Sequence, residues 1–276
     1  MAAVAGPQGT VLDIDSLPDD PLYRIRRYIG GRATVVYVHV STTEFLAEDN
    51  RTYGPGIIRL LSKLDEWRRP DWKTLTITMN AASTLQIDVD AFQPHSMSPA
   101  SIHGCYGLFD VLNLKREYNV KARTRHCLAR GAEVYVKLAR FEFEVRALER
   151  EVKVYHRLCG SAVSPALVGY VYEDTHDRVV GFITEELVGH YPESTDDYVA
   201  CSEALRDLHE VGVIHGDMNK YNIIMTKDGP KFIDFEASRL RDETTDWEKL
   251  AEKEKQNLYK GLSDQSGLGA PWDIET

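Results

Sequence analysis

Residues 213–238 read VIHGDMNKYNIIMTKDGPKFIDFEAS, and this stretch decides the fold. Two short apolar runs, Ile223–Met225 and Phe232–Phe235, flank a polar loop that contains Asp228 and Gly229. An Asp-Gly pair between two such runs is a strong signal of a β-hairpin. The sequence therefore predicts that the chain reverses here and that the two ends of the hairpin meet in space.

Polar residues stand at both ends of this hairpin. Asn222 comes directly before it, and Asp234 lies at its far end. Because a hairpin brings its ends together, we expect these two side chains to approach each other, and oxygen ligands of this kind suit Mg²⁺. Asp217, five residues before Asn222, is then free to face a substrate. A core hairpin with turn-forming Asp and Asn residues would explain the Asp-Gly pair, but not these three polar residues together.

The motifs around the hairpin resemble those of a known superfamily. His215-Gly216-Asp217, then Asn222 and Ile233-Asp234-Phe235, is similar to the catalytic loop and metal-binding aspartate of the protein-kinase-like superfamily. The His-Gly-Asp form, with Asn219 two places on, resembles RIO-type atypical kinases and aminoglycoside phosphotransferases more than ordinary protein kinases. The resemblance implies an α+β class and a bilobal protein-kinase-like fold. The C-terminal lobe of this fold is expected to be shortened. An N-terminal α/β extension is expected to precede the kinase-like fold.

The resemblance also implies a role for each of these residues. Asp217 would accept or orient the proton of an acceptor hydroxyl, and Asn222 and Asp234 would hold Mg²⁺ across the phosphates of ATP. Lys220, three residues after Asp217, is a second catalytic candidate that would touch the transferring phosphoryl group. The alternative for Lys220 is an ordinary solvent-facing lysine. His215 is expected to be structural and to make one hydrogen bond beneath the loop.

A lysine and a glutamate upstream complete the predicted nucleotide site. Lys137 lies in the expected strand Glu133–Ala139 and resembles the kinase lysine that contacts the α- and β-phosphates. A helix is predicted next by an apolar stripe with steps of three and four residues: Phe141, Val145, Leu148, Val152, Tyr155 and Cys159. Glu151 borders this stripe, and a buried carboxylate requires a cation. We therefore predict a Lys137–Glu151 ion pair, with Glu144 and Glu149 as competing candidates.

Four further runs complete an expected five-stranded N-terminal lobe. They are Leu108–Leu114, Tyr118–His126, Ala166–Glu173 and Val179–Leu187. The first two are expected to pair as a hairpin. The end of the last run resembles the kinase hinge, where backbone groups meet adenine, so Glu185 and Leu187 are assigned to ATP binding by their position.

Three features depart from the kinase pattern. No G-x-G-x-x-G motif precedes Lys137, so backbone amides around the phosphates are not assured. Tyr135 stands where kinases keep an alanine against adenine, and it would either stack beside the base or fill the pocket. Glu236 replaces the glycine of Asp-Phe-Gly, which argues against a flip of that motif as a switch.

The domain organisation follows from composition and pattern. Residues 1–22 are rich in Ala, Gly, Pro and Asp and are predicted to be a flexible tail. Residues 23–100 alternate strand and helix patterns and form the α/β extension, either a structural cap or a platform for a substrate or protein partner. Residues 101–187 form the N-lobe, and residues 188–276 the reduced C-lobe. In the C-lobe, Ser194 is expected to cap a helix.

Composition restricts the classes of partner. A chain of 276 residues with 43% hydrophobic and 28% charged residues is typical of globular proteins. Its net charge of -10 argues against nonspecific binding to nucleic acid or anionic membranes. No apolar run reaches the length of a membrane span, about 18 residues. Four widely spaced cysteines favour free thiols in a reducing compartment, so we expect a cytoplasmic protein: Cys105, Cys127, Cys159 and Cys201.

Three functions are compatible with these residues. The first is an ATP- and Mg²⁺-dependent phosphotransferase that moves the γ-phosphoryl group to a hydroxyl of a small molecule or protein. The second is a pseudokinase-like module that binds a nucleotide or a partner, which the absent glycine-rich loop and Tyr135 favour. The third is a kinase-fold enzyme that uses ATP for other transfer chemistry, such as adenylyl transfer. The filled polar positions favour the first.

Overall fold

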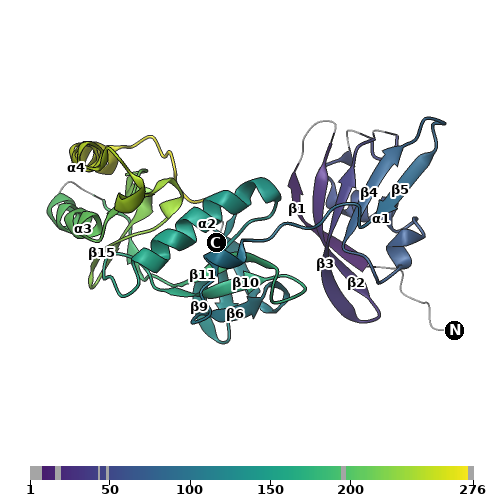
Figure 1. The fold of residues 1–276 in the computed structure, drawn as a ribbon, viewed down its shortest axis with the longest axis horizontal. Coiled ribbons are helices and arrows are strands. Elements are labelled where there is room, and N and C mark those ends of the chain that lie inside the picture. The colour runs from purple at the N-terminus through teal and green to yellow at the C-terminus, as the bar shows by residue number, and fades with distance from the viewer. Residues whose placement is uncertain (1–7, 16–19, 43, 48–49, 194–196, 273–276) are drawn as a thin grey trace. The chain divides into compact units, whose positions relative to one another are not determined.

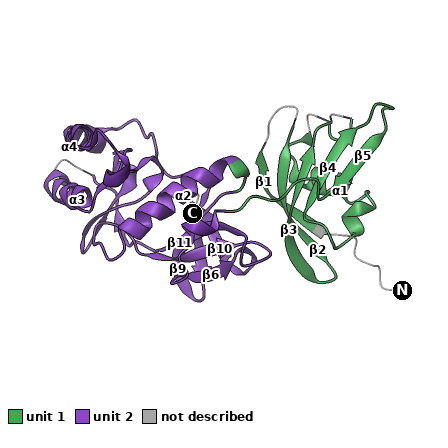
Figure 2. Ribbon diagram, in the orientation of Figure 1, with its two compact units in different colours: residues 1–96, 140–142 green, residues 97–139, 143–276 purple. Residues whose placement is uncertain are grey.

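A computed structural model describes residues 8–15, 20–42, 44–47, 50–193 and 197–272 (Figure 1). The chain divides into two compact units (Figure 2). The first contains residues 1–96 and 140–142, and the second contains residues 97–139 and 143–276. The domain boundaries predicted from the sequence, including the one at residue 100, remain predictions.

The first unit is a five-stranded sheet in the order β1-β2-β3-β4-β5. Its elements are β1 (Gln8–Asp15), β2 (Leu22–Ile29), β3 (Arg32–Val40), α1 (Gly54–Leu61), β4 (Thr74–Met79) and β5 (Leu85–Val89). The β3 and β4 strands run parallel and the other neighbours antiparallel. Parallel neighbours need a crossover, and α1 provides it. The strand and helix patterns that the sequence shows in residues 23–100 correspond to β2, β3, α1, β4 and β5.

The N-terminal tail is shorter than the sequence predicts. Gln8–Asp15 forms β1, which pairs antiparallel with β2 from Gln8↔Tyr28 to Asp15↔Leu22. The prediction of a flexible tail is wrong for these residues, because apolar side chains in the segment pack against the sheet and Asp13 accepts a bond of 2.6 Å from buried Arg24. Residues 1–7 and 16–19 of the predicted tail lie outside the described residues.

The second unit contains a six-stranded sheet in the order β6-β10-β11-β9-β8-β7. Its strands are β6 (Gly107–Asp110), β7 (Lys115–Asn119), β8 (Thr124–Ala129), β9 (Ala132–Leu138), β10 (Leu167–Tyr172) and β11 (Val179–Glu185). The helix α2 (Glu142–Arg157) contributes its apolar stripe to the same core as the sheet. Of the predicted stripe, only Cys159, beyond the end of the helix, is exposed.

The predicted hairpin between 108–114 and 118–126 is wrong. The β6 strand pairs in parallel with β10, and the Asp110 side chain accepts a 2.8 Å bond from the Leu112 amide that starts a turn after it. Instead, β7 pairs with β8 across a turn in which the Val120 amide donates to the Thr124 carbonyl at 2.9 Å. The turn falls inside the segment predicted as one strand, so the sheet has six strands rather than five.

The remaining elements surround the motif stretch. They are β12 (Gly189–His190), α3 (Tyr198–Glu210), β13 (Val213–Ile214), β14 (Ile223–Thr226), β15 (Gly229–Phe232), β16 (Arg239–Leu240) and α4 (Trp247–Ser263). The β14 and β15 strands form the predicted hairpin, closed at Thr226↔Gly229, and Gly229 has the positive φ of +109° that favours glycine there. The expected cap at Ser194 lies outside the described residues.

The mixed α+β architecture is compatible with a kinase-like fold. Apolar side chains from α2, α3, α4 and the hairpin share one core, which includes Val152, Leu205, Phe232 and Leu258. Within the described part of the chain, no helix combines the length and apolar character that crossing a membrane requires. The division of the second unit into two lobes remains a prediction.

Candidate functional site

The loop after β13 is shaped by one glycine and one histidine. Gly216 has a φ of +83°, and a Cβ there would lie 2.3 Å from the Ala237 carbonyl oxygen. His215 is fully buried, and its Nε2 donates to the Ile233 carbonyl at 2.9 Å. Its Nδ1 accepts from the Asp217 amide at 3.3 Å. These contacts give His215 the structural role that the sequence predicts and fix the position of Asp217.

A carboxylate on α4 holds the same loop from its other side. Glu254 Oε1 accepts from the Gly216 amide at 2.7 Å, and its Oε2 accepts from the His215 amide at 3.1 Å and contacts His209 Nε2 at 2.7 Å. Burial works to raise the pKa of Glu254, but the hydrogen bonds from His209 and Gly216 hold it below its usual value. The sequence does not indicate that Glu254 holds this loop, because the pattern of α4 is that of a charged surface helix.

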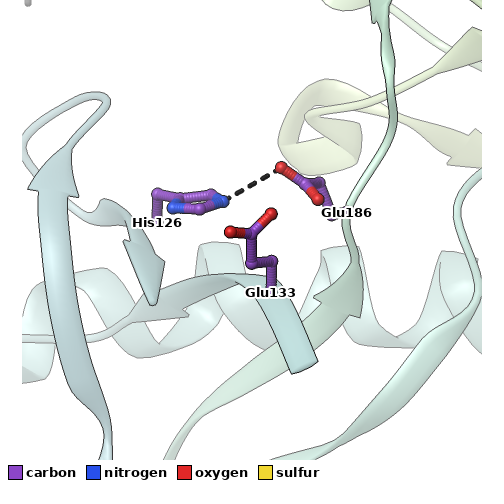
Figure 3. Close-up of side chains that lie close together, drawn as sticks. All are labelled: His126, Glu133 and Glu186. Carbon is purple, nitrogen blue, oxygen red and sulfur yellow. Dashed lines mark hydrogen bonds and ion pairs between the residues drawn. The ribbon is translucent and has the colours of Figure 1, made fainter. Parts of the chain in front are cut away.

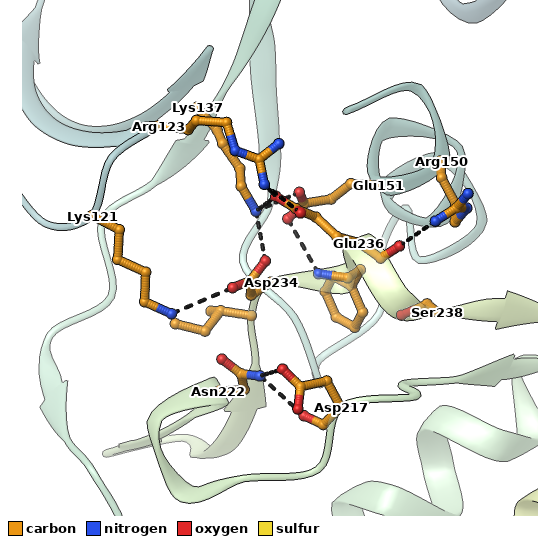
Figure 4. Close-up of polar contacts among 12 residues, drawn as sticks. Lys121, Arg123, Lys137, Arg150, Glu151, Asp217, Asn222, Asp234, Glu236 and Ser238 are labelled. Atoms are coloured by element: carbon orange, nitrogen blue, oxygen red, sulfur yellow. Dashed lines mark hydrogen bonds and ion pairs between the residues drawn. The ribbon is translucent and has the colours of Figure 1, made fainter. Parts of the chain in front are cut away.

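Asn222 connects the loop to the hairpin. Its Nδ2 donates to the Asp217 carboxylate at 2.9 Å and to the Asp217 carbonyl at 3.0 Å (Figure 4). Asn222 is only 1% exposed, and its Oδ1 has no hydrogen-bond partner among the described residues. A buried oxygen without a partner costs about 1–3 kcal/mol. Asn222 therefore offers one hard oxygen that a bound group would satisfy, while Asp217 remains exposed.

Asp234 lies next to this pair because the hairpin closes as predicted. The amide of Ile233 donates to the Asn222 carbonyl at 3.0 Å. Asp234 has a φ of +66°, a left-handed conformation that is uncommon outside glycine and frequent at functional sites. Its carboxylate accepts from Lys137 at 2.6 Å and from Lys121 at 3.4 Å. Burial opposes ionisation, but Lys137 keeps the pKa of Asp234 well below its usual range.

Lys137 stands at the centre of a buried charge network (Figure 4). Its Nζ lies 2.7 Å from Glu151, 2.6 Å from Asp234 and 2.6 Å from Glu236. Burial by itself would lower the pKa of Lys137. The effect of the three carboxylates is larger, so the pKa of Lys137 lies above its usual value. Glu151 also accepts a 3.2 Å bond from the Phe235 amide, and burial raises its pKa to about 7 against the opposing effect of Lys137. The predicted Lys137–Glu151 pair is therefore present.

The competing glutamates have other partners. Glu144 lies 3.9 Å from Arg123, and Glu149 accepts a 2.5 Å bond from the Ser98 amide. Neither is among the carboxylates that contact Lys137 in the described part of the chain. Glu149 stands on a different side of the helix from Glu151, whereas Glu144 is buried on the same face, seven residues earlier, and lies beside Arg123 instead.

Two cations in the β7–β8 turn were missed by the sequence analysis. Lys121 reaches Asp234, and Arg123 donates to Glu236 Oε1 at 2.6 Å (Figure 4). This turn connects the two strands before β9, where kinases carry their glycine-rich loop. Basic residues in a turn usually extend into solvent, so the sequence gives no sign that these two point inward. Glu236 likewise was read only as a missing glycine.

A pocket extends from this network along the sheet. It is lined at one end by Lys121, Thr124, Lys137, Glu151 and Asp234, and at the other by Tyr135, Thr184, Glu185, Leu187 and Tyr191. Glu185 and Leu187 both line this pocket, and their contact with adenine remains a prediction. The Glu185 carboxylate accepts from the Ala166 amide at 2.9 Å, so its side chain has a structural partner. Tyr135 forms part of the wall of the pocket.

Beside this end of the sheet, three chemically active side chains gather (Figure 3). His126 Nε2 lies 3.1 Å from Glu186 Oε1, and Glu133 is close to both. The nearby Glu186 carboxylate raises the pKa of Glu133. The sequence analysis gave no functional role to these three side chains. Because His126 is already engaged by Glu186 and Glu133 is exposed, the cluster alone assigns no metal ion.

Lys220 is not brought to the cluster. Its Nζ lies 5.2 Å from the centre of the Tyr221 ring and 3.5 Å from Gln265 Oε1. Lys220 does not line the pocket described above. It also does not line a second cavity, between α4 and the loop at residues 216–219, that is lined by Asp217. Lys220 is half-buried beside Tyr221 and away from the cluster, and we do not include it in the proposed site.

The part of the chain that carries the motifs matches a known family. The family model described as RIO domain matches residues 184–264. The match supports a RIO-type relationship within the protein-kinase-like superfamily, whereas the resemblance to aminoglycoside phosphotransferases remains a prediction. At the family level, a RIO domain implies an atypical kinase-like phosphotransferase that binds ATP. No curated protein matched the chain.

Glu151 provides the first test of this network. Glu151→Ala is expected to lower the free energy of unfolding by about 1–3 kcal/mol, because the substitution leaves the buried Phe235 amide without its acceptor. Lys137 keeps two other carboxylates, so the loss should stay below that of an isolated buried pair, about 3–5 kcal/mol. Turnover should fall strongly. Urea denaturation beside a product assay, with the exposed Glu142→Ala as control, measures both; equal activity in wild type and Glu151→Ala would contradict the role.

Proposed function

We propose that the protein is an ATP- and Mg²⁺-dependent phosphotransferase that moves the γ-phosphoryl group of ATP to a hydroxyl of a small molecule or protein. One observation carries the proposal. Asn222 is bonded to Asp217, Lys137 is paired with Asp234, and the Ile233 amide beside Asp234 donates to the Asn222 carbonyl, while the buried Asn222 Oδ1 has no partner among the described residues. A purely structural network would be expected to satisfy that oxygen.

The donor set suits a hard divalent cation. Asn222 Oδ1 and the Asp234 carboxylate would hold Mg²⁺, which prefers oxygen ligands and also binds phosphates. When bound, Mg²⁺ would neutralise part of the negative charge on the phosphates. Lys137, positioned by Glu151, would hold the α- and β-phosphates. Asp217, exposed and hydrogen-bonded to Asn222, would orient the acceptor hydroxyl and receive its proton.

The β7–β8 turn suggests how the phosphates are held without a glycine-rich loop. Lys121 and Arg123 bring two cations to the network through carboxylates that lie beside Lys137. Their charges would act on the phosphates where backbone amides act in other kinases. Adenine would lie toward Glu185 and Leu187, with Tyr135 beside it.

Lys121→Ala should weaken ATP binding without changing the fold. One charged contact to a phosphate is worth about 1.5–3 kcal/mol, so a loss of about tenfold or more in affinity is expected. Lys115→Ala provides a matched control, because Lys115 is an exposed lysine of β7 that pairs only with Glu117 at 3.5 Å among the described residues. Calorimetric titration with ATP and Mg²⁺ measures the difference. Equal affinities for both variants would exclude Lys121 from the site.

Product analysis tests the function itself. Wild-type protein incubated with γ-labelled ATP and Mg²⁺ should transfer the label to an acceptor and leave ADP. Transfer of the adenylyl group instead would favour the alternative of other ATP chemistry.

The pseudokinase-like alternative is favoured by the closed network around Lys137, in which three carboxylates already neutralise the lysine. It predicts nucleotide binding without any product.

A further inference from the structure

A second cavity lies on the α4 side of the catalytic loop. It measures about 1000 Å³ and is bounded by the loop at residues 216–219, by residues 237–239 and by one face of α4. Asp217 lines this cavity but not the pocket that contains Lys137 and Asp234. The proposed donor and acceptor sides of the reaction are therefore lined by different residues, and Asn222, which donates to Asp217, lines neither of them.

The wall of this cavity is fixed close to Asp217. A Cβ added to Gly261 of α4 would lie 2.2 Å from the Met218 carbonyl oxygen, so the helix and the loop are in direct backbone contact. Glu254, about two turns earlier on the same helix, holds the amides of His215 and Gly216. A ligand seated against α4 would consequently be held at a defined distance from the Asp217 carboxylate.

Three cations line the cavity. Arg239, Lys253 and Lys260 are exposed there, and none of them forms an ion pair with a carboxylate in the described part of the chain. Lys253 and Lys260 are seven residues apart, which places them on one face of α4. In a chain with a net charge of -10, these three cations form a local positive group, and Lys260 also acts on the Asp264 carboxylate. Such a group favours an anionic ligand.

Three carboxylates also line the cavity and offset the charge of the cations taken together, so a preference for an anion has to come from the local pair Lys253 and Lys260. Glu254 is occupied by the loop amides and His209. Asp264 accepts from the Ser266 amide at 2.9 Å, and hydrogen bonds from Ser266, together with Lys220 and Lys260, lower its pKa. Asp217 is the remaining carboxylate, and it has the role of proton acceptor in the proposed reaction.

We infer that this cavity binds the acceptor and that the acceptor is a small anionic alcohol, with its phosphate or carboxylate group at Lys253 and Lys260 and its hydroxyl at Asp217. The inference rests on the proposed function. In the reaction, the acceptor oxygen forms a bond to the γ-phosphorus, the bond from the γ-phosphorus to the bridging oxygen breaks, and ADP leaves. The hydroxyl proton passes to Asp217 and then to solvent.

Binding without nucleotide tests the inference directly. Ribose 5-phosphate is titrated against ribose, and glucuronate against glucose, into wild-type protein by calorimetry or NMR. In at least one pair the anionic member should bind at least tenfold more tightly, and which pair does so identifies a phosphate or a carboxylate as the preferred group. The Lys253→Ala/Lys260→Ala variant should lose about tenfold of that affinity, equivalent to about 1.4 kcal/mol.

Lys255→Ala is the matched control, because Lys255 is an exposed lysine of α4 that does not line the cavity. Equal binding of charged and neutral members in both pairs, or an equal loss in Lys255→Ala, would overturn the inference. A separate titration with ATP and Mg²⁺ tests the proposed function. If the protein binds the anionic sugar but no nucleotide, the proposed phosphotransferase function is refuted and the ligand class of the cavity stands. If it binds ATP with Mg²⁺ but shows no preference for the anionic sugar, only the ligand class is refuted.

Discussion

Asp217→Asn is expected to lower turnover by about 10²–10⁴-fold while the affinity for ATP stays close to that of wild type. The asparagine keeps an oxygen that can accept from Asn222 Nδ2, so the loop geometry should persist. What is lost is the carboxylate that would receive the proton. Asp217 does not line the nucleotide pocket, and no ion pair joins it to a lysine of that pocket in the described part of the chain.

Steady-state product formation and calorimetric titration with ATP and Mg²⁺ measure the two effects separately. Asp228→Asn is a suitable control, because Asp228 is an exposed aspartate in the hairpin turn. A parallel loss of affinity in Asp217→Asn would show that the residue acts on the nucleotide rather than on the acceptor. Unchanged turnover would remove Asp217 from the mechanism.

Asp234→Asn should change the affinity for ATP. Whether the affinity rises or falls relative to wild type should depend on the presence of Mg²⁺. With Mg²⁺, ATP affinity should fall by at least about tenfold, because a charged metal ligand is lost. Without Mg²⁺, the variant should bind ATP at least as well as wild type, because a carboxylate that occupies Lys137 at 2.6 Å and repels phosphates has been removed. The two titration curves, compared between wild type and variant, provide the measurement.

An equal gain in affinity from Mg²⁺ in wild type and Asp234→Asn would contradict the metal site. The same pair of variants separates the pseudokinase-like alternative. In that case wild type forms no product, so Asp217→Asn has nothing to lose, while Asp234→Asn still alters nucleotide binding. Turnover in wild type that disappears in Asp217→Asn is therefore the result that favours an enzyme.

The parts of the site that could be predicted have local signals. Asp228-Gly229 between two apolar runs predicts the hairpin, and hairpin closure brings Asn222 and Asp234 together. The Lys137–Glu151 pair follows from a strand pattern and a helical stripe, since each determines which way its side chain points. Sequence spacing is sufficient for the hairpin because its geometry is set within one turn; for the ion pair it gives only the direction of each side chain, and Glu144 and Glu149 remained competing candidates until the structure was described.

The parts that could not be predicted depend on contacts distant in sequence. The parallel pairing of β6 with β10 and the inward direction of Lys121 and Arg123 leave no periodic pattern. Glu254 contacts a loop about forty residues earlier in the chain, and its helix shows only ordinary surface charge. The β1 strand was obscured because its neighbours are rich in turn-forming residues.

The position of Glu254 in the chain has a consequence for synthesis on the ribosome. A nascent chain that has emerged as far as Asp234 already contains every residue proposed to contact the nucleotide or the acceptor hydroxyl. It still lacks the carboxylate that accepts from the His215 and Gly216 amides, so these two donors have no acceptor in the loop. We therefore expect the loop to become fully ordered only after α4 has been made and docked, so that the site is assembled late in translation.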